Sequence, residues 1–339
     1  MNRLEPVFIF KEMLYNITMS KKKLVVQKNE AGERLDKLLV EKFPQYSRSY
    51  FQKMIKGAKV LVNAKNVAAH TMLKENDEVT IELVEPTKIS LEPDPSIKLD
   101  IVFEDQDFLV INKPAGLVVH PSQSNPKHTL VNGILAYYPP IASVGDNTFR
   151  PGIVHRLDKE VSGLIAVAKN QSSFLHLKEQ FQKRTINKRY LALVHGKLSQ
   201  TEGEIDLNIG RSQRKPSRMS VKQKREGKSA LTHYRVLKEY GRYSLLEITT
   251  KTGRTHQIRV HLFSLGHSIA GDKIYRNKNI KTNQNISRIF LHAGFLQFIG
   301  REGELKEFKV DLPLNLSRYL SDLKAQSSGL RAHSPRPRA

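Results

Sequence analysis

The 339-residue sequence contains no cysteine, and this absence excludes both a disulfide framework and a zinc site built from thiolates. No group of histidines has the spacing of metal ligands, and no apolar run approaches the roughly 18 residues that a membrane-spanning helix requires. The apolar cluster at residues 7–10 is too short for a signal-peptide core and follows an acidic residue. We therefore expect a metal-free, cytoplasmic protein.

Acidic residues are scarce relative to basic ones. The chain has 33 Asp and Glu against 56 Lys and Arg, and its net charge of +23 exceeds what solubility requires. Such an excess indicates a polyanionic partner, and nucleic acid, an anionic membrane surface and an acidic protein all satisfy this description. The length exceeds one average domain, so we expect a catalytic domain of roughly 200 to 250 residues and a small accessory module.

Two short helices and a few strands are predicted between residues 31 and 84. The first helix begins after Gly32, and the second follows Ser47 as its N-cap and ends at Gly57, which we expect in a left-handed conformation. Strands are predicted at residues 59–63 and 79–83. The apolar residues of the two helices recur at helical spacing and predict a small core: Leu35, Leu38, Leu39, Phe43, Tyr50 or Phe51, Met54 and Ile55.

The basic residues in or beside these helices include Arg34, Lys37, Arg48 and Lys53. Each one alone is typical of a solvated surface, but four in adjacent helices indicate contacts with phosphate groups. The segments GERLDKLL, SRS and VLVN, at residues 32–39, 47–49 and 60–63, resemble the small RNA-binding module that ribosomal protein S-four shares with several RNA-modifying enzymes. The resemblance implies that this α/β module binds RNA.

The region beyond the module begins with a proline-rich stretch at residues 85–98, which we expect to be an extended linker. Predicted strand pairs then outnumber helices, and this pattern favours an α+β fold with a mainly antiparallel mixed sheet over a doubly wound parallel sheet. The basic stretch 211–228 is expected to be a solvated loop that becomes ordered on RNA. The strands are predicted at residues 101–103, 108–111, 164–168, 190–194, 231–237 and 243–248, and the helices at 130–138 and 172–183.

Two polar segments of this region carry candidate chemistry. In the segment GIVHRLDKEVSG, residues 152–163, Asp158 lies among three basic side chains just before a predicted strand. In the segment TGRTHQIRVH, residues 252–261, Arg254, His256 and Gln257 lie near the start of a predicted helix. Taken singly, the first arrangement is typical of a structural salt bridge and the second of an ordinary basic helix.

The two segments occur together with further motifs in a definite order. These are NKPAGL, VHP, KRYLA and IAGD, at residues 112–117, 119–121, 188–192 and 269–272. The combination resembles the RluA-type family of RNA pseudouridine synthases, nearest to its ribosomal-RNA, RluD-like branch, over roughly residues 32–312. The resemblance implies an isomerase that converts uridine to pseudouridine in structured RNA, with large-subunit ribosomal RNA favoured.

The resemblance also implies roles for individual residues. Asp158 would be the catalytic nucleophile, and Tyr190 would stack on the target base. Arg254 would pair with Asp158. Arg156 would enter the RNA where the uridine leaves it, and His155 would support this loop. Flipping a base out of its stack costs a few kcal/mol, and a guanidinium plane is able to stack on the neighbouring bases.

The reaction leaves two points of chemistry to consider. The carboxylate attacks either C6 of the uracil or C1′ of the ribose, and the sequence does not choose between them. No redox step occurs and no atoms are added, so no cofactor is expected. Two other functions stay open: a transfer-RNA pseudouridine synthase, and a non-catalytic RNA-binding or ribosome-assembly factor, against which the presence of Asp158, Tyr190 and Arg254 argues.

These patterns predict one organisation of the chain. A monomer is expected, because there is no heptad repeat or long apolar edge. The predicted segments are an N-terminal extension at 1–30 with Met19 as an alternative start, the RNA-binding module at 31–84, the linker at 85–98, the catalytic domain at 99–325, and a disordered basic tail at 326–339.

Overall fold

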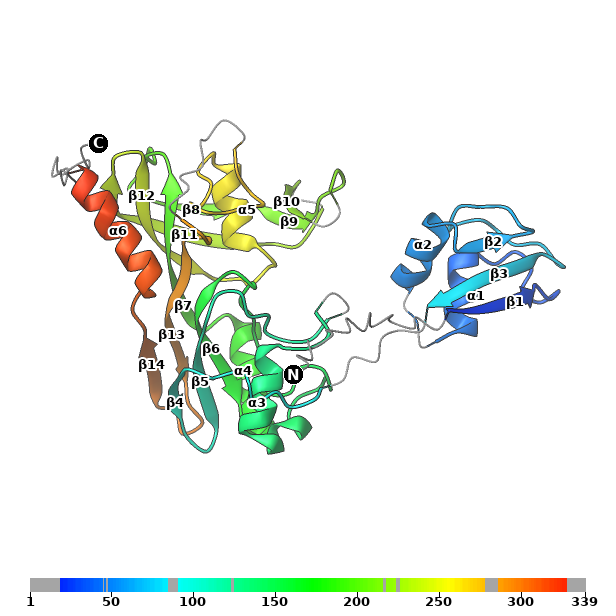
Figure 1. Ribbon diagram of the computed structural model, residues 1–339, viewed down its shortest axis with the longest axis horizontal. Coiled ribbons are helices and arrows are strands. Elements are labelled where there is room, and N and C mark those ends of the chain that lie inside the picture. Colours follow the sequence, from blue (N-terminus) through cyan, green and yellow to red (C-terminus); the bar gives the residue numbers. More distant parts are fainter. Residues whose placement is uncertain are drawn as a thin grey trace, which may run out of the picture. The chain divides into compact units, whose positions relative to one another are not determined.

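The structure is a computed structural model that describes residues 19–44, 46, 48–84, 91–122, 125–215, 218–223, 226–277 and 286–327 (Figure 1). The chain divides into two compact units, Met1–Lys88 and Ile89–Ala339. The predicted Ser47 cap, the first half of the linker and most of the N-terminal extension and basic tail lie outside the described residues. Among the described residues, no helix is both long and apolar enough to cross a membrane.

The first unit contains a three-stranded antiparallel sheet and two helices. The predicted helical stripes form its core, and Leu35, Leu39, Phe51 and Ile55 are almost completely inaccessible to solvent. Burying one such side chain contributes about 1.5–3 kcal/mol, so these stripes are what holds the helices on the sheet. The elements are β1 (Met19–Val25), α1 (Leu35–Lys42), α2 (Arg48–Lys56), β2 (Val60–Val62) and β3 (Glu78–Val84), with sheet order β1-β3-β2.

Two details of the first unit differ from the expectations. The sequence does not predict β1, because Lys21, Lys22 and Lys23 interrupt any apolar alternation. β1 is an edge strand, and lysine is common on such strands. The prediction of a left-handed Gly57 is wrong: its N–H still donates to the carbonyl of Lys53 at 3.0 Å, and Ala58 adopts the left-handed conformation with φ 54°.

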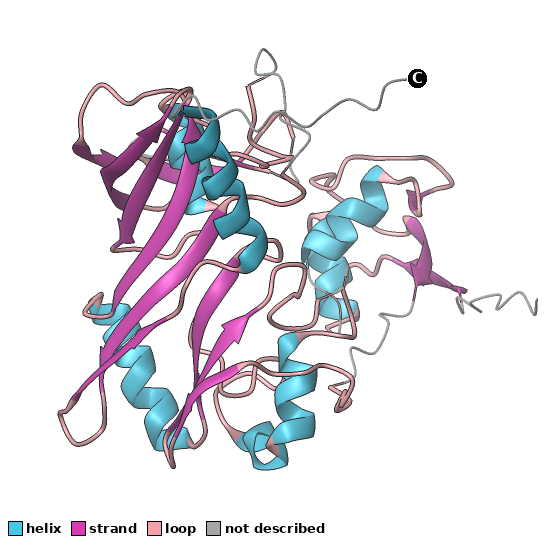
Figure 2. Ribbon diagram, turned by 60° about the vertical axis from the view of Figure 1, so that its left-hand side comes forward, coloured by secondary structure: helices cyan, strands magenta, loops and turns pink. Residues whose placement is uncertain are grey.

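The second unit is built on a nine-stranded mixed sheet, whose long strands run side by side in Figure 2. Its order is β4-β5-β6-β13-β7-β12-β11-β8, with β14 paired to β13, and the neighbours are antiparallel except for β6 and β13. The predicted α+β class is therefore confirmed. The strands are β4 (Ile101–Glu104), β5 (Phe108–Lys113), β6 (Ser162–Ala168), β7 (Asn187–His195), β8 (Glu202–Asp206), β11 (Leu231–Tyr240), β12 (Tyr243–Thr250), β13 (Leu291–Ile299) and β14 (Leu305–Lys309).

Helices cover this sheet and divide its core into two clusters. α3 (Leu130–Tyr137) and α4 (Gln171–Lys183) pack with β5 and β6, whereas α5 (Gln257–Ser264) and α6 (Leu314–Ser327) pack with β7, β12 and β13. The clusters meet where β6 runs parallel to β13. Gly163 has φ 121° there, and a Cβ atom would overlap the backbone of Ala293. Glycine therefore permits the close approach that brings the Asp158 segment beside β13.

Two stretches that we expected to be irregular are partly structured. The second half of the predicted linker packs on the second unit, because the Asn132 amide donates to the carbonyl of Glu92 at 2.8 Å and Ile97 is buried. The basic stretch 211–228 contributes to a short antiparallel pair, β9 (Asn208–Arg211) with β10 (Met219–Lys222). The expectation of a loop throughout 211–228 is therefore wrong.

Candidate active site

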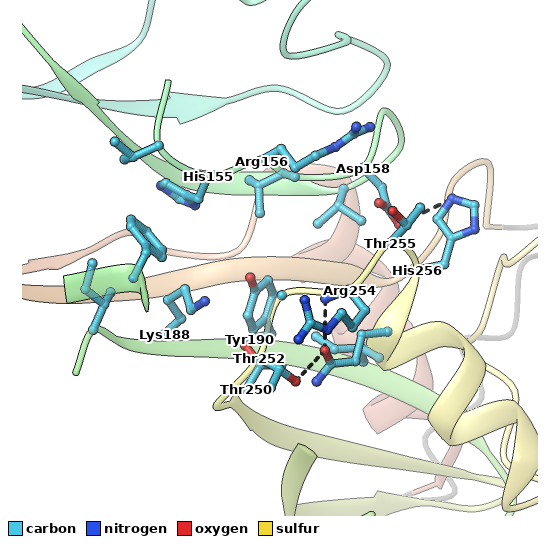
Figure 3. Close-up of a pocket in the computed structure, with 18 of the residues that line it drawn as sticks. His155, Arg156, Asp158, Lys188, Tyr190, Thr250, Thr252, Arg254, Thr255 and His256 are labelled. Atoms are coloured by element: carbon cyan, nitrogen blue, oxygen red, sulfur yellow. Dashed lines mark hydrogen bonds and ion pairs between the residues drawn. The ribbon is translucent and has the colours of Figure 1, made fainter. Parts of the chain in front are cut away.

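A pocket of about 530 Å³ in the second unit collects the proposed chemical groups (Figure 3). Asp158, Tyr190 and Arg254 line it, and so do His155 and Arg156. These residues come from the segment before β6, from β7 and from the segment before α5. The structure thus brings together five positions that are up to about a hundred residues apart in the sequence.

The Asp158 segment alternates in exposure. Arg156 is exposed, Leu157 is buried, and the side chain of Asp158 is 17% exposed. A turn follows, in which the N–H of Val161 donates to the carbonyl of Asp158 at 3.1 Å before β6 begins. Leu157 therefore anchors the segment in the core while its two neighbours remain accessible from the pocket.

Lys113 anchors the same segment through its backbone, a role that the sequence analysis did not predict. Its ammonium donates to the carbonyls of Pro114, Leu117 and Lys159 at 2.7, 2.9 and 3.2 Å. The N–H of Gly116 also donates to the Lys159 carbonyl, at 2.8 Å. Burial favours the neutral amine and lowers the pKa of Lys113 to about 7. The NKPAGL motif is the signal in the sequence, and its lysine fixes the backbone immediately after Asp158.

The partner of Asp158 differs from the predicted one. Arg259 of α5 lies 3.3 Å from the Asp158 carboxylate, whereas the Arg254 side chain donates to the carbonyl of Ser229 at 3.0 Å. Within the described part of the chain, no ion pair joins Arg254 to Asp158. The predicted pairing is wrong because Arg254 precedes the helix, while Arg259 lies inside it and faces the carboxylate.

Asp272 holds Arg259 in this position. The two oxygens of Asp272 accept from Arg259 Nε and Nη2 at 2.7 and 2.9 Å, which leaves Nη1 for Asp158. Burial opposes the charge of Arg259, but the hydrogen bond and charge of Asp272, together with Asp158, raise the pKa of its guanidinium above the ordinary value. Asp272 belongs to the IAGD motif and Arg259 to the GRTHQIR segment. These two motifs were the signal in the sequence from which this pairing was available.

Gln257 connects the Arg254 segment to the sheet. Its carbonyl oxygen accepts from the Thr252 hydroxyl at 2.7 Å and from the Arg254 N–H at 3.0 Å. Its amide donates to the carbonyl of Leu231 and the hydroxyl of Thr232, both at 2.9 Å. Every polar atom of this buried side chain is used. Gln257 therefore fixes the loop that carries Arg254 to β11.

Tyr190 is one of the aromatic residues that line the pocket. It lies on β7, where its register partner on β12 is Ile248. Burial raises the pKa of Tyr190 to about 12, the charge of Asp158 adds to this effect, and a hydrogen bond with Thr250 opposes it. The phenol therefore keeps its proton near neutral pH and presents both a ring face and a hydroxyl to the pocket.

His155 is a half-buried residue of the pocket lining. The N–H of Ala166 donates to its Nε2 at 2.8 Å, and its ring stacks on Phe181 with centroids 4.7 Å apart. Burial lowers the pKa of His155 to about 3, so the ring is neutral at physiological pH. Support of this loop by His155 stays a prediction.

The four basic residues of the first unit that were predicted to contact phosphate fall into two pairs. Arg34 and Arg48 each donate two hydrogen bonds to the carboxylate of Asp36, at 3.0–3.3 Å. Burial opposes the charge of Asp36, but the hydrogen bonds from Arg48, Gln52 and Arg34 lower its pKa to about 2. Lys37 and Lys53 are exposed. Arg48 therefore joins α2 to α1, Arg34 bonds within the first turn of α1, and the lysines are the freer candidates for phosphate contact.

Comparison with known proteins identifies the class that this fold and pocket define. The profile described as RNA pseudouridylate synthase matches residues 107–264, and the S4 domain matches residues 33–79. The chain belongs to the RNA pseudouridylate synthase family, so it is an RNA-modifying isomerase with RNA as its partner.

Particular relatives match nearly the whole chain. It is 39% identical over 303 residues to the uncharacterized RNA pseudouridine synthase YlyB of Bacillus subtilis (strain 168), covering 89% of this chain and 97% of that protein. It is 40% identical over 312 residues to ribosomal large subunit pseudouridine synthase D of Escherichia coli O6:H1, covering 88% and 93%. The solved structure of human RNA pseudouridylate synthase domain containing 1 matches with a TM-score of 0.52 and 26% identity, over 73% of this chain and 100% of that one.

Proposed function

We propose that this chain isomerises uridine to pseudouridine in large-subunit ribosomal RNA, with Asp158 as the nucleophile. The main support is the placement of the Asp158 carboxylate in the pocket, where it pairs with Arg259 and its charge acts on Tyr190. The preference for ribosomal RNA rests on the relatives named ribosomal large subunit pseudouridine synthase D.

The proposed reaction conserves all atoms of the uridine. The bond from N1 to C1′ breaks, a bond from C5 to C1′ forms, C5 loses its proton and N1 gains one. Asp158 attacks either uracil C6 or ribose C1′ to detach the base for rotation. A neighbouring cation stabilises a carboxylate in a site that excludes water, and Arg259 supplies that charge. The family's chemistry requires no other reactant.

Three further side chains suit the handling of the base. Arg156 is exposed at the pocket and has a planar guanidinium that is able to stack where the uridine leaves the RNA. The ring of Tyr190 offers a face for the uracil, and its hydroxyl is a hydrogen-bond donor. Arg254 lines the same pocket and has guanidinium nitrogens beyond the one that contacts Ser229, so we assign it to the substrate.

Each unit has a place in this proposal. The first unit binds RNA through Lys37 and Lys53, while Arg34 and Arg48 pair with the carboxylate of Asp36. Residues 99–325 form the catalytic domain. The protein acts in the cytoplasm as a monomer without a cofactor, and light scattering of the purified protein should give a mass near 38.7 kDa.

Mapping of pseudouridines tests the function directly. Ribosomal and transfer RNA from cells with and without the gene are labelled chemically and read by primer extension. We expect loss of signal at defined large-subunit uridines. The wild-type gene and an Asp322→Asn control on the exposed face of α6 should restore the signal, whereas Asp158→Asn should not.

The other outcomes are equally decisive. Loss of signal only in transfer RNA would move the substrate, and loss at no site would favour an RNA-binding or assembly factor. Restoration by Asp158→Asn would refute the mechanism.

A further inference from the structure

His256 occupies a position that its residue type does not favour. It has φ 56° and ψ 22°, a left-handed conformation that glycine and asparagine adopt with less strain. It is also the N-cap of α5, yet its side chain makes no capping hydrogen bond. Serine, threonine, aspartate and asparagine are preferred at such caps. Two local preferences are thus violated at the edge of the pocket, where a functional demand is the usual reason.

The imidazole connects the nucleophile to a buried tyrosine. Its Nε2 lies 3.8 Å from the Asp158 carboxylate, and its Nδ1 lies 2.9 Å from the hydroxyl of Tyr275. The backbone N–H of Met219 in β10 donates to the same hydroxyl at 2.9 Å. Tyr275 is 4% exposed and the His256 side chain 19%. Four groups from distant segments therefore lie one after another in a row: the Met219 N–H, the Tyr275 hydroxyl, the His256 imidazole and the Asp158 carboxylate.

The row selects one tautomer of the imidazole. The Tyr275 oxygen accepts from Met219, so its own proton is free to be donated to His256 Nδ1. A neutral imidazole that accepts at Nδ1 carries its proton on Nε2, the nitrogen that faces the Asp158 carboxylate. The opposite tautomer would point a lone pair at that carboxylate. The contacts at both ends of the ring therefore favour the same arrangement.

We propose that His256 is a positioning residue for the isomerisation: oriented by Tyr275, it directs its Nε2–H at Asp158 and fixes the carboxylate for attack together with Arg259. The inference rests on the proposed function. The distance of 3.8 Å is longer than a hydrogen bond, and catalytic hydrogen bonds commonly shorten when substrate is bound. The two donors lie at different positions of α5, its N-cap and its interior, so together they restrict the rotation of the carboxylate.

The charge state of His256 supports this role. Burial lowers the pKa of the imidazole below its ordinary value, and Arg259 and Arg156 act in the same direction, while Asp158 and Asp272 oppose them. The ring is therefore neutral near pH 7. Protonation at lower pH places a proton on Nδ1, which reverses the hydrogen bond with Tyr275 and forms an ion pair that weakens the carboxylate as a nucleophile.

The experiment compares three variants of the full-length protein. The substrate is an unmodified large-subunit ribosomal RNA transcript tritiated at uracil C5, and tritium release reports the lost C5 proton. His256→Asn tolerates the left-handed backbone but lacks a donor at the Nε2 position. His256→Gln retains a donor near that position, and Tyr275→Phe removes only the hydroxyl. His233→Asn is the matched control, since that histidine contacts Glu204 on the outer part of the sheet.

We expect His256→Asn to lower the single-turnover rate by about 10- to 100-fold, the effect of a misplaced reacting group, while RNA affinity changes by less than about twofold. His256→Gln should recover part of the rate, and Tyr275→Phe should lower it by several fold. The decline of the wild-type rate at acidic pH should be weaker in His256→Gln. The His233→Asn control should match the wild type.

Three outcomes would overturn the inference. One is a rate for both His256→Asn and Tyr275→Phe within twofold of wild type. Another is a loss of RNA affinity that accounts for the loss of rate, since this would make His256 an RNA contact. If His256→Asn fails to fold, full activity of Tyr275→Phe is the third. An inactive wild-type protein would instead refute the proposed function, so the two failures are distinguishable.

Discussion

Arg259 donates a hydrogen bond to Asp158 through Nη1, and its Nε and Nη2 donate to Asp272. The guanidinium therefore joins α5 to two separate segments, and one of its partners is the proposed nucleophile. Because a planar guanidinium has five N–H donors in a rigid arrangement, it is able to hold one carboxylate bidentately and still reach a second. A lysine at this position has a single nitrogen, which does not reproduce the geometry.

This relationship predicts unequal effects of two arginine substitutions. Arg259→Met leaves the buried Asp272 without its partner, and breaking a buried ion pair costs about 3–5 kcal/mol. We expect a clear fall in melting temperature and loss of measurable isomerisation. Arg254→Met should reduce activity with little change in melting temperature, because among the described residues the Arg254 side chain has one hydrogen bond, to the Ser229 carbonyl. Calorimetry and tritium release measure both effects, and equal destabilisation by the two variants would contradict the assignment.

The nucleophile itself should be separable from RNA binding. Asp158→Asn preserves the size of the side chain and removes its charge, so isomerisation should be abolished. RNA affinity, measured by filter binding, should remain within a few fold of wild type. A loss of RNA binding in proportion to the loss of activity would show that Asp158 serves mainly to order the pocket. Activity of Asp158→Asn equal to that of the wild type would exclude Asp158 as the nucleophile.

Lys113 predicts a pH dependence of stability. Its pKa is about 7 in the folded protein and is lowered from 10.5, so between these values the unfolded chain binds more protons than the folded one. Stability due to this group therefore rises with pH from about 7 to about 10.5, by at most about 1.4 kcal/mol per pH unit. Chemical denaturation at pH 7 and pH 9 should show a smaller rise in Lys113→Met than in wild type.

The matched control for that measurement is Lys159→Met, an exposed lysine in the segment that Lys113 holds. It should retain the wild-type pH dependence. A Lys113→Met variant with an unchanged dependence would show that the amine stays protonated on its three carbonyl acceptors throughout this range.

In the first unit we expect the lysines to bind RNA and the arginines to stabilise the fold. The logarithm of RNA affinity falls linearly with the logarithm of salt concentration. Replacing both Lys37 and Lys53 by alanine should make the slope of this line shallower by about two, one for each lost phosphate contact. The melting temperature should not change, since both side chains are exposed. Asp36→Asn should instead lower the melting temperature, because it weakens the bonds to Arg34 and Arg48.

The pH dependence of the Asp36 contribution has the opposite sign to that of Lys113. The pKa of Asp36 is lowered from 3.8 to about 2, so its stabilisation is present above pH 3.8 and is lost as the pH falls towards 2.

Removal of residues 1–84 should flatten the salt dependence of binding to long RNA. An unchanged slope would place the main phosphate contacts in the second unit.

Local pattern was enough to predict much of this protein. The helices α1, α3 and α4 follow from apolar residues at helical spacing, and β5 and β12 from short apolar runs, because each of these elements buries one continuous stripe or strand. The motifs around Asp158, Tyr190 and Arg254 were equally visible, since a family resemblance depends on residue order. The strongly basic composition indicated a polyanionic partner, and membership of the family identifies that partner as RNA.

Only the tertiary structure decided which of these residues act on one another. The sequence offered two arginines five residues apart, and the helical start at Gln257 determines that Arg259, rather than Arg254, faces Asp158. The row from Asp158 through His256 to Tyr275 joins segments that no spacing rule connects, because it depends on β6 running parallel to β13 and on the path of the chain around α5. Hydrogen bonds and ion pairs require positions accurate to fractions of an ångström, and packing of the whole fold determines those positions.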